Sequence, residues 1–415
     1  MLSKALILGI DLGTSGVRVA IINLDKKLIY LEEISYKVGI EEPNDWANCL
    51  EILIRKIPKI IKLNIISCAV SGTSGTLLAC HKDGKPTSKA IPYYKDYLEK
   101  RLTINKLFSS DSRYLYNASS LRRGLHLLEI NNSKIILRHQ SDWISGWLID
   151  DWSMGEEASN IKLGWNQADK CWPKSFFKQN LINKLPIIIK SGGIMKKISF
   201  KKANKLGLNP NTIIYAGTTD SNASVLSVEP NIDEGVTILG STIVIKKFNE
   251  YPIIANGISN HLLNGKWLCG GASNSGPAVL RQFFSDRQIS ELSRQIDPKQ
   301  NSGLNYYPLP RTGERFPIED ECLEPKLHPR PISDALFIHG LLEGLTYVEK
   351  LAWEKFKELG ISMPKRIITL GGGSQNPQWK KIREKNLMVP IVNSKHSTAF
   401  GTALIAHRAY THSQR

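Results

Sequence analysis

The first residues with clear chemical potential form a polar turn between two apolar segments, Leu6–Ile10 and Val17–Ile22. Both segments are rich in β-branched side chains, as strands buried on both faces are. Glycine lets a backbone approach a ligand closely, and hydroxyl and N–H groups can converge on an anion. An unpaired carboxylate at the end of a buried strand is costly, so a metal ion, water or a sugar hydroxyl would have to satisfy it. The turn therefore predicts an anion site or an ordinary polar hairpin. Its residues are Asp11, Gly13, Thr14, Ser15 and Gly16.

Further loops also combine glycine with hydroxyl or amide side chains after an apolar run. Ligands of α/β proteins bind at the carboxyl ends of such strands, so these loops are candidate binding elements. The sequence contains neither Gly-x-x-x-x-Gly-Lys-[Ser/Thr] nor Gly-x-Ser-x-Gly, which excludes a P-loop and disfavours an α/β-hydrolase. The loops are Ser71–Thr76, Gly217–Ser224, Gly240–Thr242, Gly270–Asn274 and Gly371–Asn376.

Asp220 is the carboxylate most suited to acid–base chemistry. It follows a strand-like run, Ile213–Ala216, and precedes a predicted helix, Ser221–Val228. A carboxylate at that point is either an N-cap for the helix or a proton acceptor, and the two roles are compatible because a capping side chain is held rigidly.

Three motifs in order resemble those of one family. Gly9–Arg18 (Gly-Ile-Asp-Leu-Gly-Thr-Ser-Gly-Val-Arg) resembles the first phosphate motif of the sugar kinase, actin and heat-shock-chaperone superfamily, and is most similar to that of FGGY-family carbohydrate kinases. Gly217–Ala223 resembles the Gly-x-x-Asp-x-x-Ala element that carries the family's catalytic base. Gly371–Asn376 resembles its adenosine motif. The resemblance extends from about residue 6 to residue 406.

The resemblance implies an α/β protein of two actin-like (ribonuclease H-like) domains around a central cleft. A strand–turn–strand pattern near the N-terminus is echoed at Val236–Ile245, which fits two copies of one fold. The polar segment Pro230–Gly235 predicts the boundary. Residues 1–229 would form the sugar and phosphate domain, and residues 230–415 the nucleotide domain. Ser333 is expected to cap a long core helix that ends at Gly360.

The resemblance also implies a chemistry, with ATP and Mg²⁺ as cofactors and a sugar as acceptor. Asp220 would be the catalytic base and contact the substrate, and Asp11 would hold Mg²⁺ through water or orient the sugar. The other implied substrate-binding residues are Ser15, Gly16, Val17 and Arg18. The implied nucleotide-binding residues are Gly13, Thr14, Gly240, Ser241, Thr242, Gly271, Gly371, Gly372, Gly373, Ser374, Gln375 and Asn376.

Three segments look most like the compact D-ribulose kinase branch of this family: Gly9–Arg18, Gly270–Gly276 and Gly313–Pro317. The favoured reaction is phosphorylation of D-ribulose to D-ribulose 5-phosphate, and D-xylulose or another sugar or polyol is the alternative. Tyr93–Asp96 stands where the family has Trp-x-Asp, so Asp96 matches and the aromatic residue differs. A non-enzymatic nucleotide-dependent switch is a second hypothesis, which Asp220 and an acceptor-side loop disfavour.

The composition limits the remaining classes. The formal charge of +17 raises the question of nucleic acid, but the lysines are spread along the chain, so we expect a solvated surface that attracts anions such as ATP. Six cysteines without Cys-x-x-Cys favour reduced thiols and no structural zinc. Charged residues interrupt the apolar runs, which disfavours a signal peptide or a membrane span. We expect a cytoplasmic monomer or homodimer without nucleic-acid or membrane partners.

Overall fold

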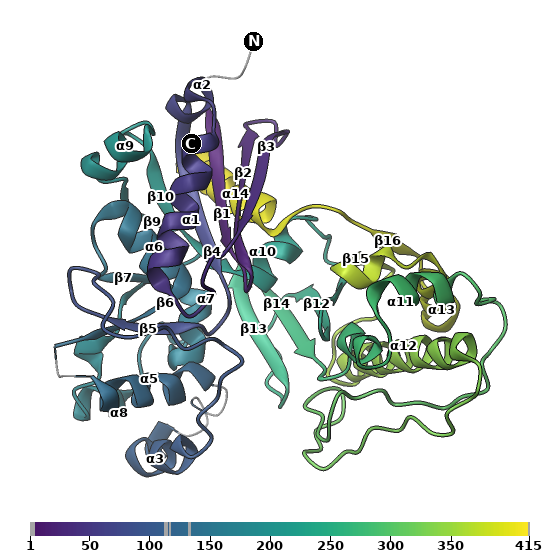
Figure 1. Cartoon of the computed structure of the whole chain (residues 1–415). Coiled ribbons are helices and arrows are strands. Elements are labelled where there is room, and N and C mark those ends of the chain that lie inside the picture. The colour runs from purple at the N-terminus through teal and green to yellow at the C-terminus, as the bar shows by residue number, and fades with distance from the viewer. Residues whose placement is uncertain (1–4, 112–114, 116–117, 132–133, 414–415) are drawn as a thin grey trace. The chain divides into compact units, whose positions relative to one another are not determined.

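The computed structural model describes residues 5–111, 115, 118–131 and 134–413, and the chain divides into two compact units (Figure 1). Unit 1 comprises residues 1–227 and 396–415, and unit 2 comprises residues 228–395. The expected second domain, residues 230–415, is therefore wrong at its end. The C-terminal helix α14 (Thr398–Ser413) belongs to unit 1, because its apolar side chains complete that unit's core.

Unit 1 contains a six-stranded sheet whose central strand is β1 (Leu6–Leu12). β1 pairs antiparallel with β2, and β2 with β3, while β1, β4 and β10 run parallel. Every residue of β1 is buried, as its apolar pattern predicts. The other strands, from one edge to the other, are β3 (Leu28–Ser35), β2 (Gly16–Asn23), then beyond β1 β4 (Ile65–Gly72), β10 (Ile213–Thr219) and β9 (Ile194–Lys197).

Helices and two small sheets complete unit 1. The helices Pro43–Lys56 and Lys59–Leu63 are separated at Pro58, because a proline disfavours helical backbone at the residue before it. The small sheets pair β5 (Leu77–Cys80) with β6 (Ile136–His139) and β7 (Met154–Glu156) with β8 (Ile187–Ile189). Besides α14, the helices of unit 1 include α1 (Pro43–Lys56), α2 (Lys59–Leu63), α3 (Lys100–Leu107), α5 (Ser119–Ile130), α6 (Gln140–Ile149), α7 (Glu157–Asn160), α8 (Lys174–Lys178), α9 (Phe200–Leu206) and α10 (Asp220–Leu226).

Unit 2 repeats this plan. β11 (Glu234–Leu239) pairs antiparallel with β12 (Ile243–Asn249) and parallel with β15 (Arg366–Leu370), as β1 pairs with β2 and β4. The sheet continues to β14 and β13 on one side and to β16 on the other. The prediction of an α/β protein built on two similar sheets is confirmed. The bounds of the outer strands are β13 (Ile258–Leu263), β14 (Lys266–Ala272) and β16 (Ile391–Asn393).

The long helix of unit 2, α12 (Asp334–Glu358), begins and ends as predicted. The Ser333 hydroxyl accepts a hydrogen bond from the backbone N–H of Leu336, and Gly360 follows the helix with a φ of 88°. Pro277–Gln282 forms a 3-10 segment. The remaining helices are α11 (Asp286–Ser293) and α13 (Pro377–Leu387). In the part of the chain that the structure describes, no helix is long and apolar enough to span a membrane.

Close backbone packing holds α14 against the sheet of unit 1 (Figure 1). Gly9 on β1 makes this approach possible, and Gly401 on α14 allows α14 to lie equally close to helix α10. A Cβ at Gly9 would lie 2.1 Å from the carbonyl oxygen of Ala399, and one at Gly401 would lie 1.8 Å from that of Ala223. Since these neighbours are backbone atoms, they could yield only if a helix or strand shifted.

The substitution Gly401→Ala is therefore expected to destabilise unit 1 by about 1–3 kcal/mol, the usual cost of overpacking. Thermal unfolding of the two proteins measures the difference. Gly240→Ala is the control, because a Cβ at Gly240 meets no atom within 4 Å. Equal melting temperatures for Gly401→Ala and the parent chain would contradict the packing described for α14.

Candidate active site

In unit 1 the carboxyl ends of three parallel strands meet at one edge of the sheet. Asp11 on β1 lies opposite Ser71 on β4, and Gly72 at the end of β4 lies opposite Thr219 at the end of β10. This register brings three predicted elements to the same edge. They are the turn after β1, the acceptor-side loop Thr73–Thr76 and Asp220.

Asp11 is a buried carboxylate with few compensating partners. Its Oδ2 accepts a hydrogen bond from Arg18 Nη1 at 3.2 Å, and its Oδ1 accepts one from Ser71 Oγ at 3.3 Å. Burial, and next the negative charge of Asp220, raise the pKa of Asp11 to about 7, and these two partners only partly offset that rise. A cation or a further hydrogen-bond donor beside Asp11 would stabilise its charge.

This shift predicts a pH dependence of folding. The ordinary pKa of Asp11 is 3.8 and its pKa in the folded protein is about 7, so the folded chain binds this proton more tightly than the unfolded chain. The resulting stabilisation is complete below about pH 4 and is lost as the pH rises through about 7, with a size on the order of a few kcal/mol. Between pH 5 and pH 8 the free energy of unfolding, measured with urea, should fall less in Asp11→Asn than in the parent chain. Identical losses would count against this environment for Asp11.

Asp220 is the first residue of α10 and is partly exposed. The N-cap of this helix is Thr219, whose Oγ1 accepts from the N–H of Asn222 at 3.3 Å, while Asp220 Oδ1 accepts from the N–H of Ser221 at 2.7 Å. The interpretation of Asp220 as the N-cap is therefore wrong. The negative charge of Asp220 raises the pKa of Asp11, so the two carboxylates lie in one electrostatic environment.

The residues of the turn after β1 differ in their exposure to solvent. Thr14 and Ser15 are exposed, whereas the side chain of Val17 is fully buried in the core. A Cβ at Gly16 would lie 2.2 Å from the carbonyl oxygen of Ile34. Val17 and Gly16 can therefore meet a ligand only through their backbone.

A backbone hydrogen bond closes the same turn, and ion pairs of Arg18 support it. The N–H of Gly13 donates to the carbonyl of Gly16 at 2.9 Å, which closes the turn. Arg18 donates to Glu33 Oε2 at 3.0 Å as well as to Asp11, so it links the buried carboxylate to an exposed one. Arg18 thereby fixes the orientation of Asp11.

Sequence reasoning missed a polar group beside this edge. Gln140 Oε1 accepts from the backbone N–H of Thr73 at 3.0 Å and from its hydroxyl at 2.7 Å, and Gln140 Nε2 donates to Tyr36 Oη at 3.3 Å. Burial, and next the charge of Asp11, raise the pKa of the Tyr36 phenol. Gln140 and Tyr36 lie outside every motif, and only the long-range pairing of the strands reveals them.

In unit 2 a second strand edge gathers two of the predicted nucleotide elements. Ile238 on β11 lies opposite Leu370 on β15, so the turn Gly240–Thr242 and the loop Gly371–Gln375 follow neighbouring parallel strands. Gly371 has a φ of 88°, which favours glycine, and a Cβ at Gly240 or Gly372 would meet no atom within 4 Å. These two elements present open backbone, as close approach of a ligand requires.

Other predicted nucleotide residues have partners within the protein. A Cβ at Gly271 would lie 2.3 Å from the ring of Phe316, so packing alone accounts for that glycine. Asn376 caps α13, because its Oδ1 accepts from the N–H groups of Gln378 and Trp379 at 3.1 and 3.0 Å. Its Nδ2 donates to Ser293 Oγ at 2.8 Å. Asn376 has a structural role, and its contact with a nucleotide stays a prediction.

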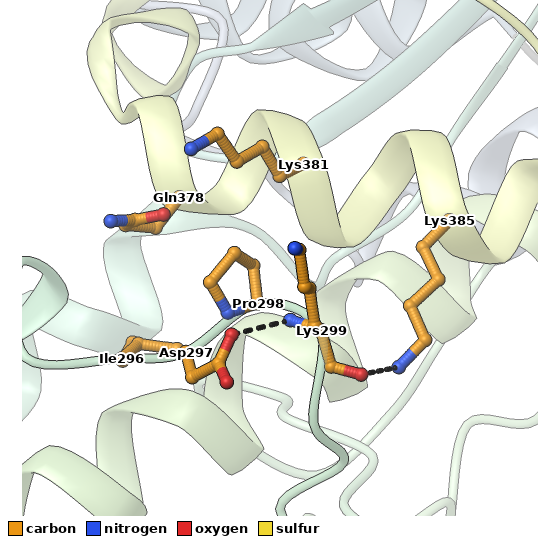
Figure 2. Close-up of a pocket in the computed structure, with 7 residues that line it drawn as sticks. All are labelled: Ile296, Asp297, Pro298, Lys299, Gln378, Lys381 and Lys385. Atoms are coloured by element: carbon orange, nitrogen blue, oxygen red, sulfur yellow. Dashed lines mark hydrogen bonds between the residues drawn. The ribbon is translucent and has the colours of Figure 1, made fainter.

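A pocket of about 610 Å³ lies beside α13 in unit 2 (Figure 2). Figure 2 shows side chains of α13 along one wall and the segment after α11 along the other. None of the residues predicted to bind the nucleotide lines it. The lining residues are Ile296, Asp297, Pro298, Lys299, Gln378, Lys381 and Lys385.

The donor set fits Mg²⁺ held with the substrate rather than by the protein alone. Within the described residues, no group of three or more histidine, cysteine, aspartate or glutamate side chains could hold a metal ion. Mg²⁺ is commonly bound through one or two carboxylates, water and substrate phosphates. Asp11, buried beside an exposed turn, suits that arrangement.

The comparisons with known proteins agree with this architecture. Solved structures with the same fold include a xylulose kinase from Lactobacillus acidophilus, with a TM-score of 0.82, 18% identity and coverage of 99% of this chain and 90% of that one. A gluconate kinase from the same organism has a TM-score of 0.84, 17% identity and the same coverage of both chains. The fold is therefore that of the sugar kinases in the actin-like ATPase class, as predicted.

Sequence matches relate part of the chain to one family. Residues 244–410 match the C-terminal domain of the FGGY family of carbohydrate kinases. A xylulose kinase of Staphylococcus xylosus is 22% identical over 97% of this chain and 90% of its own length. A ribulokinase of Staphylococcus aureus (strain Mu3) is 22% identical over 61% of this chain and 56% of its own length. Residues 244–410 therefore form a C-terminal domain of the FGGY type, and the comparisons support a sugar kinase.

Proposed function

We propose that the protein transfers the γ-phosphoryl group of ATP to a ketopentose, with D-ribulose giving D-ribulose 5-phosphate as the favoured reaction. The observation that carries this proposal is the pair Asp11 and Asp220 at one strand edge of unit 1. Asp220 is partly exposed and does not serve as the helix cap, and it lies in the same electrostatic environment as the buried Asp11.

In this proposal Asp220 accepts the proton of the acceptor hydroxyl. The transition state of phosphoryl transfer is loose and needs little activation of the nucleophile, so a base of low pKa can take the proton late. Asp11 would hold Mg²⁺ through water, and Arg18 keeps Asp11 oriented. Mg²⁺ held there would neutralise charge on the phosphates.

The nucleotide is assigned to unit 2, with the phosphates at Gly240–Thr242 and the adenosine at Gly371–Gln375. The open backbone of Gly240 and Gly372 supports this assignment, since a phosphate or a flat ring can approach it closely.

The choice of sugar rests on resemblance. Relatives named xylulose kinase and one named ribulokinase 2 each match nearly the whole chain, so D-xylulose is kept as the first alternative. Three segments that resemble the D-ribulose kinase branch favour D-ribulose. We also propose a cytoplasmic location, because the exposed cysteines Cys171 and Cys322 are free thiols, as a reducing compartment favours. A monomer or homodimer stays a prediction.

A panel assay tests this function. The purified protein is incubated with ATP, Mg²⁺ and, separately, D-ribulose, D-xylulose, glycerol and gluconate, and ADP release and the mass of the product are followed. We expect the highest kcat/KM with D-ribulose, and Asp220→Asn is the matched inactive control. Comparable kcat/KM for glycerol would refute the ketopentose assignment, and ADP release without a phosphorylated product would refute the kinase reaction.

A further inference from the structure

The turn Gly240–Thr242 of unit 2 lacks the ion pair that supports the corresponding turn of unit 1. In unit 1, Asp11 lies opposite Arg18 one residue pair before the turn, and the two side chains form an ion pair. At the same register of the second hairpin, Ile238 lies opposite Val244, and neither side chain is charged. Support for the turn of unit 2 therefore has to come from other segments of the chain.

The segment Ser273–Ala278, here called the bracing loop, joins the strand that follows this turn. The N–H of Ser273 donates to the carbonyl of Ile243 at 2.9 Å, and the N–H of Ile243 donates to the carbonyl of Ser275 at 2.8 Å. These two bonds extend the ladder between β12 and β14 beyond the end of β14. Because Ile243 is the first residue of β12, the bracing loop fixes this strand at the point where the turn ends.

The bracing loop also contacts the turn itself. The N–H of Ala278 donates to the carbonyl of Ser241 at 3.1 Å. A Cβ at Gly276 would lie 2.4 Å from the Cα of Thr242, so the two backbones pack without room for a side chain. Since this contact joins backbone to backbone, a displacement of the bracing loop would displace the turn.

A buried carboxylate from a third segment fastens the bracing loop. Glu314 is 3% exposed, and both of its oxygens accept hydrogen bonds. Oε2 accepts from Ser273 Oγ at 2.5 Å and from Tyr307 Oη at 3.1 Å. Oε1 accepts from the backbone N–H of Asn274 at 2.7 Å and from that of Arg315 at 2.9 Å. The carboxylate therefore holds two consecutive residues of the bracing loop.

An ionised carboxylate suits this position because it only accepts hydrogen bonds, and bonds to a charged acceptor are stronger than neutral ones. Burial, and next the negative charge of Glu314, raise the pKa of the Tyr307 phenol, so the phenol stays protonated and donates. Ser273 Oγ in turn accepts from the N–H of Ser275 at 2.9 Å. The hydrogen bonds of Glu314 thus continue into the bracing loop.

We propose that Glu314 is a positioning residue for the nucleotide, which fastens the bracing loop and thereby holds the turn Gly240–Thr242 in the conformation that accepts the phosphates of ATP. This inference rests on the proposed function. Backbone N–H groups bind phosphate well when they already converge, because ordering a loose turn on binding costs conformational entropy. Loss of the carboxylate should therefore weaken nucleotide binding and leave sugar binding in unit 1 unchanged.

The test measures the Kd for ADP by titration calorimetry and the KM values for ATP and for the preferred pentulose. In Glu314→Ala we expect the Kd for ADP and the KM for ATP to rise by about 10-fold, the cost of ordering one or two flexible groups on binding. The KM for the pentulose should stay the same.

The conservative variant Glu314→Gln should recover most of the affinity for ADP. Its amide oxygen can still accept from the backbone N–H groups of Asn274 and Arg315, and its amide nitrogen can donate to the two hydroxyls once these rotate. If Glu314→Ala fails to fold, Ser273→Ala takes its place, because it removes one bond of the carboxylate to the bracing loop. The Kd for ADP should rise in this variant as well.

Glu343→Ala is the matched control within unit 2. Glu343 on α12 also accepts from a serine hydroxyl and from a backbone N–H, both of Ser302, so it fastens a different loop in a similar way. Glu343→Ala should lower the melting temperature and leave the Kd for ADP unchanged. Melting temperatures of all variants separate a loss of stability from a loss of nucleotide affinity.

An unchanged Kd for ADP in folded Glu314→Ala, or in folded Ser273→Ala where it takes its place, overturns the inference. An equal rise of the Kd for ADP in Glu343→Ala overturns it too, as does an equal rise of the KM for the pentulose in Glu314→Ala. These outcomes leave the proposed function standing, because the parent chain still binds ADP and phosphorylates the sugar. If the parent chain binds no ADP, the proposed function fails and the inference fails with it.

Discussion

Replacing Asp220 by asparagine is expected to lower kcat by about 10²–10⁴-fold, the usual effect of removing a general base. The melting temperature should change little, because Thr219 caps α10 and Asp220 does not. The variant also removes a negative charge that raises the pKa of Asp11, so that pKa should fall. Affinity for ATP should stay the same, since the proposed adenosine loop belongs to unit 2.

Thr219→Ala is the matched control for this experiment. Loss of a capping side chain costs about 0.5–2 kcal/mol, so Thr219→Ala should lower the melting temperature while most of kcat remains. Steady-state kinetics, thermal unfolding and ADP titration on both variants separate catalysis from folding. A wild-type kcat in Asp220→Asn would contradict the proposed mechanism. A loss of kcat that parallels the loss of stability in both variants would also contradict it.

The second large effect is expected from Arg383→Met, with a loss of about 3–5 kcal/mol in the free energy of unfolding. Arg383 on α13 is 1% exposed and Glu349 on α12 is fully buried. The guanidinium donates to both carboxylate oxygens of Glu349, at 2.6 and 2.7 Å. Removing the arginine leaves a carboxylate in the core without a counter-charge. The unpaired buried charge is what destabilises the folded state.

The double variant Arg383→Met, Glu349→Leu is the informative comparison. It removes both charges and keeps apolar bulk, so it should be clearly more stable than Arg383→Met alone. Thr237 donates to Glu349 and Arg383 donates to Thr369, so two hydroxyls lose a partner and the recovery is not complete. Urea unfolding of the parent chain, of Arg383→Met, of Glu349→Leu and of the double variant gives the coupling free energy of the pair. A double variant as unstable as the single one would show that the buried charge is not the cause.

The features that could be predicted from the sequence are those with a local physical signal. Continuous β-branched runs predict β1 and β2 within one or two residues, because strands buried on both faces need apolar side chains throughout. Ser333 and Gly360 predict both ends of α12 by capping chemistry. The order of the glycine loops led to the right fold class and to the family whose C-terminal domain matches residues 244–410.

The features that could not be predicted depend on contacts between distant segments. Nothing near Gln140 indicates that its amide would hold Thr73, because that contact exists only once two loops are placed side by side. The capping role of Thr219 was assigned to its neighbour, since either side chain suits a helix start. The small residues of α14 indicate close packing, but the sequence does not identify the element against which the helix packs. The roles of the candidate site residues remain predictions.

The placement of α14 has a consequence for the order in which the protein is made. Unit 1 is interrupted after Ser227 and resumes at His396, so all of unit 2 is synthesised before unit 1 is complete. Until α14 emerges from the ribosome, the apolar side chains of Ile7, Ala20 and Tyr215 lack their covering helix. Domains generally fold as units during translation, so unit 2 is free to fold first. Unit 1, which begins the chain, is then the last to complete its fold. Until then it exposes an apolar surface of the kind that chaperones bind.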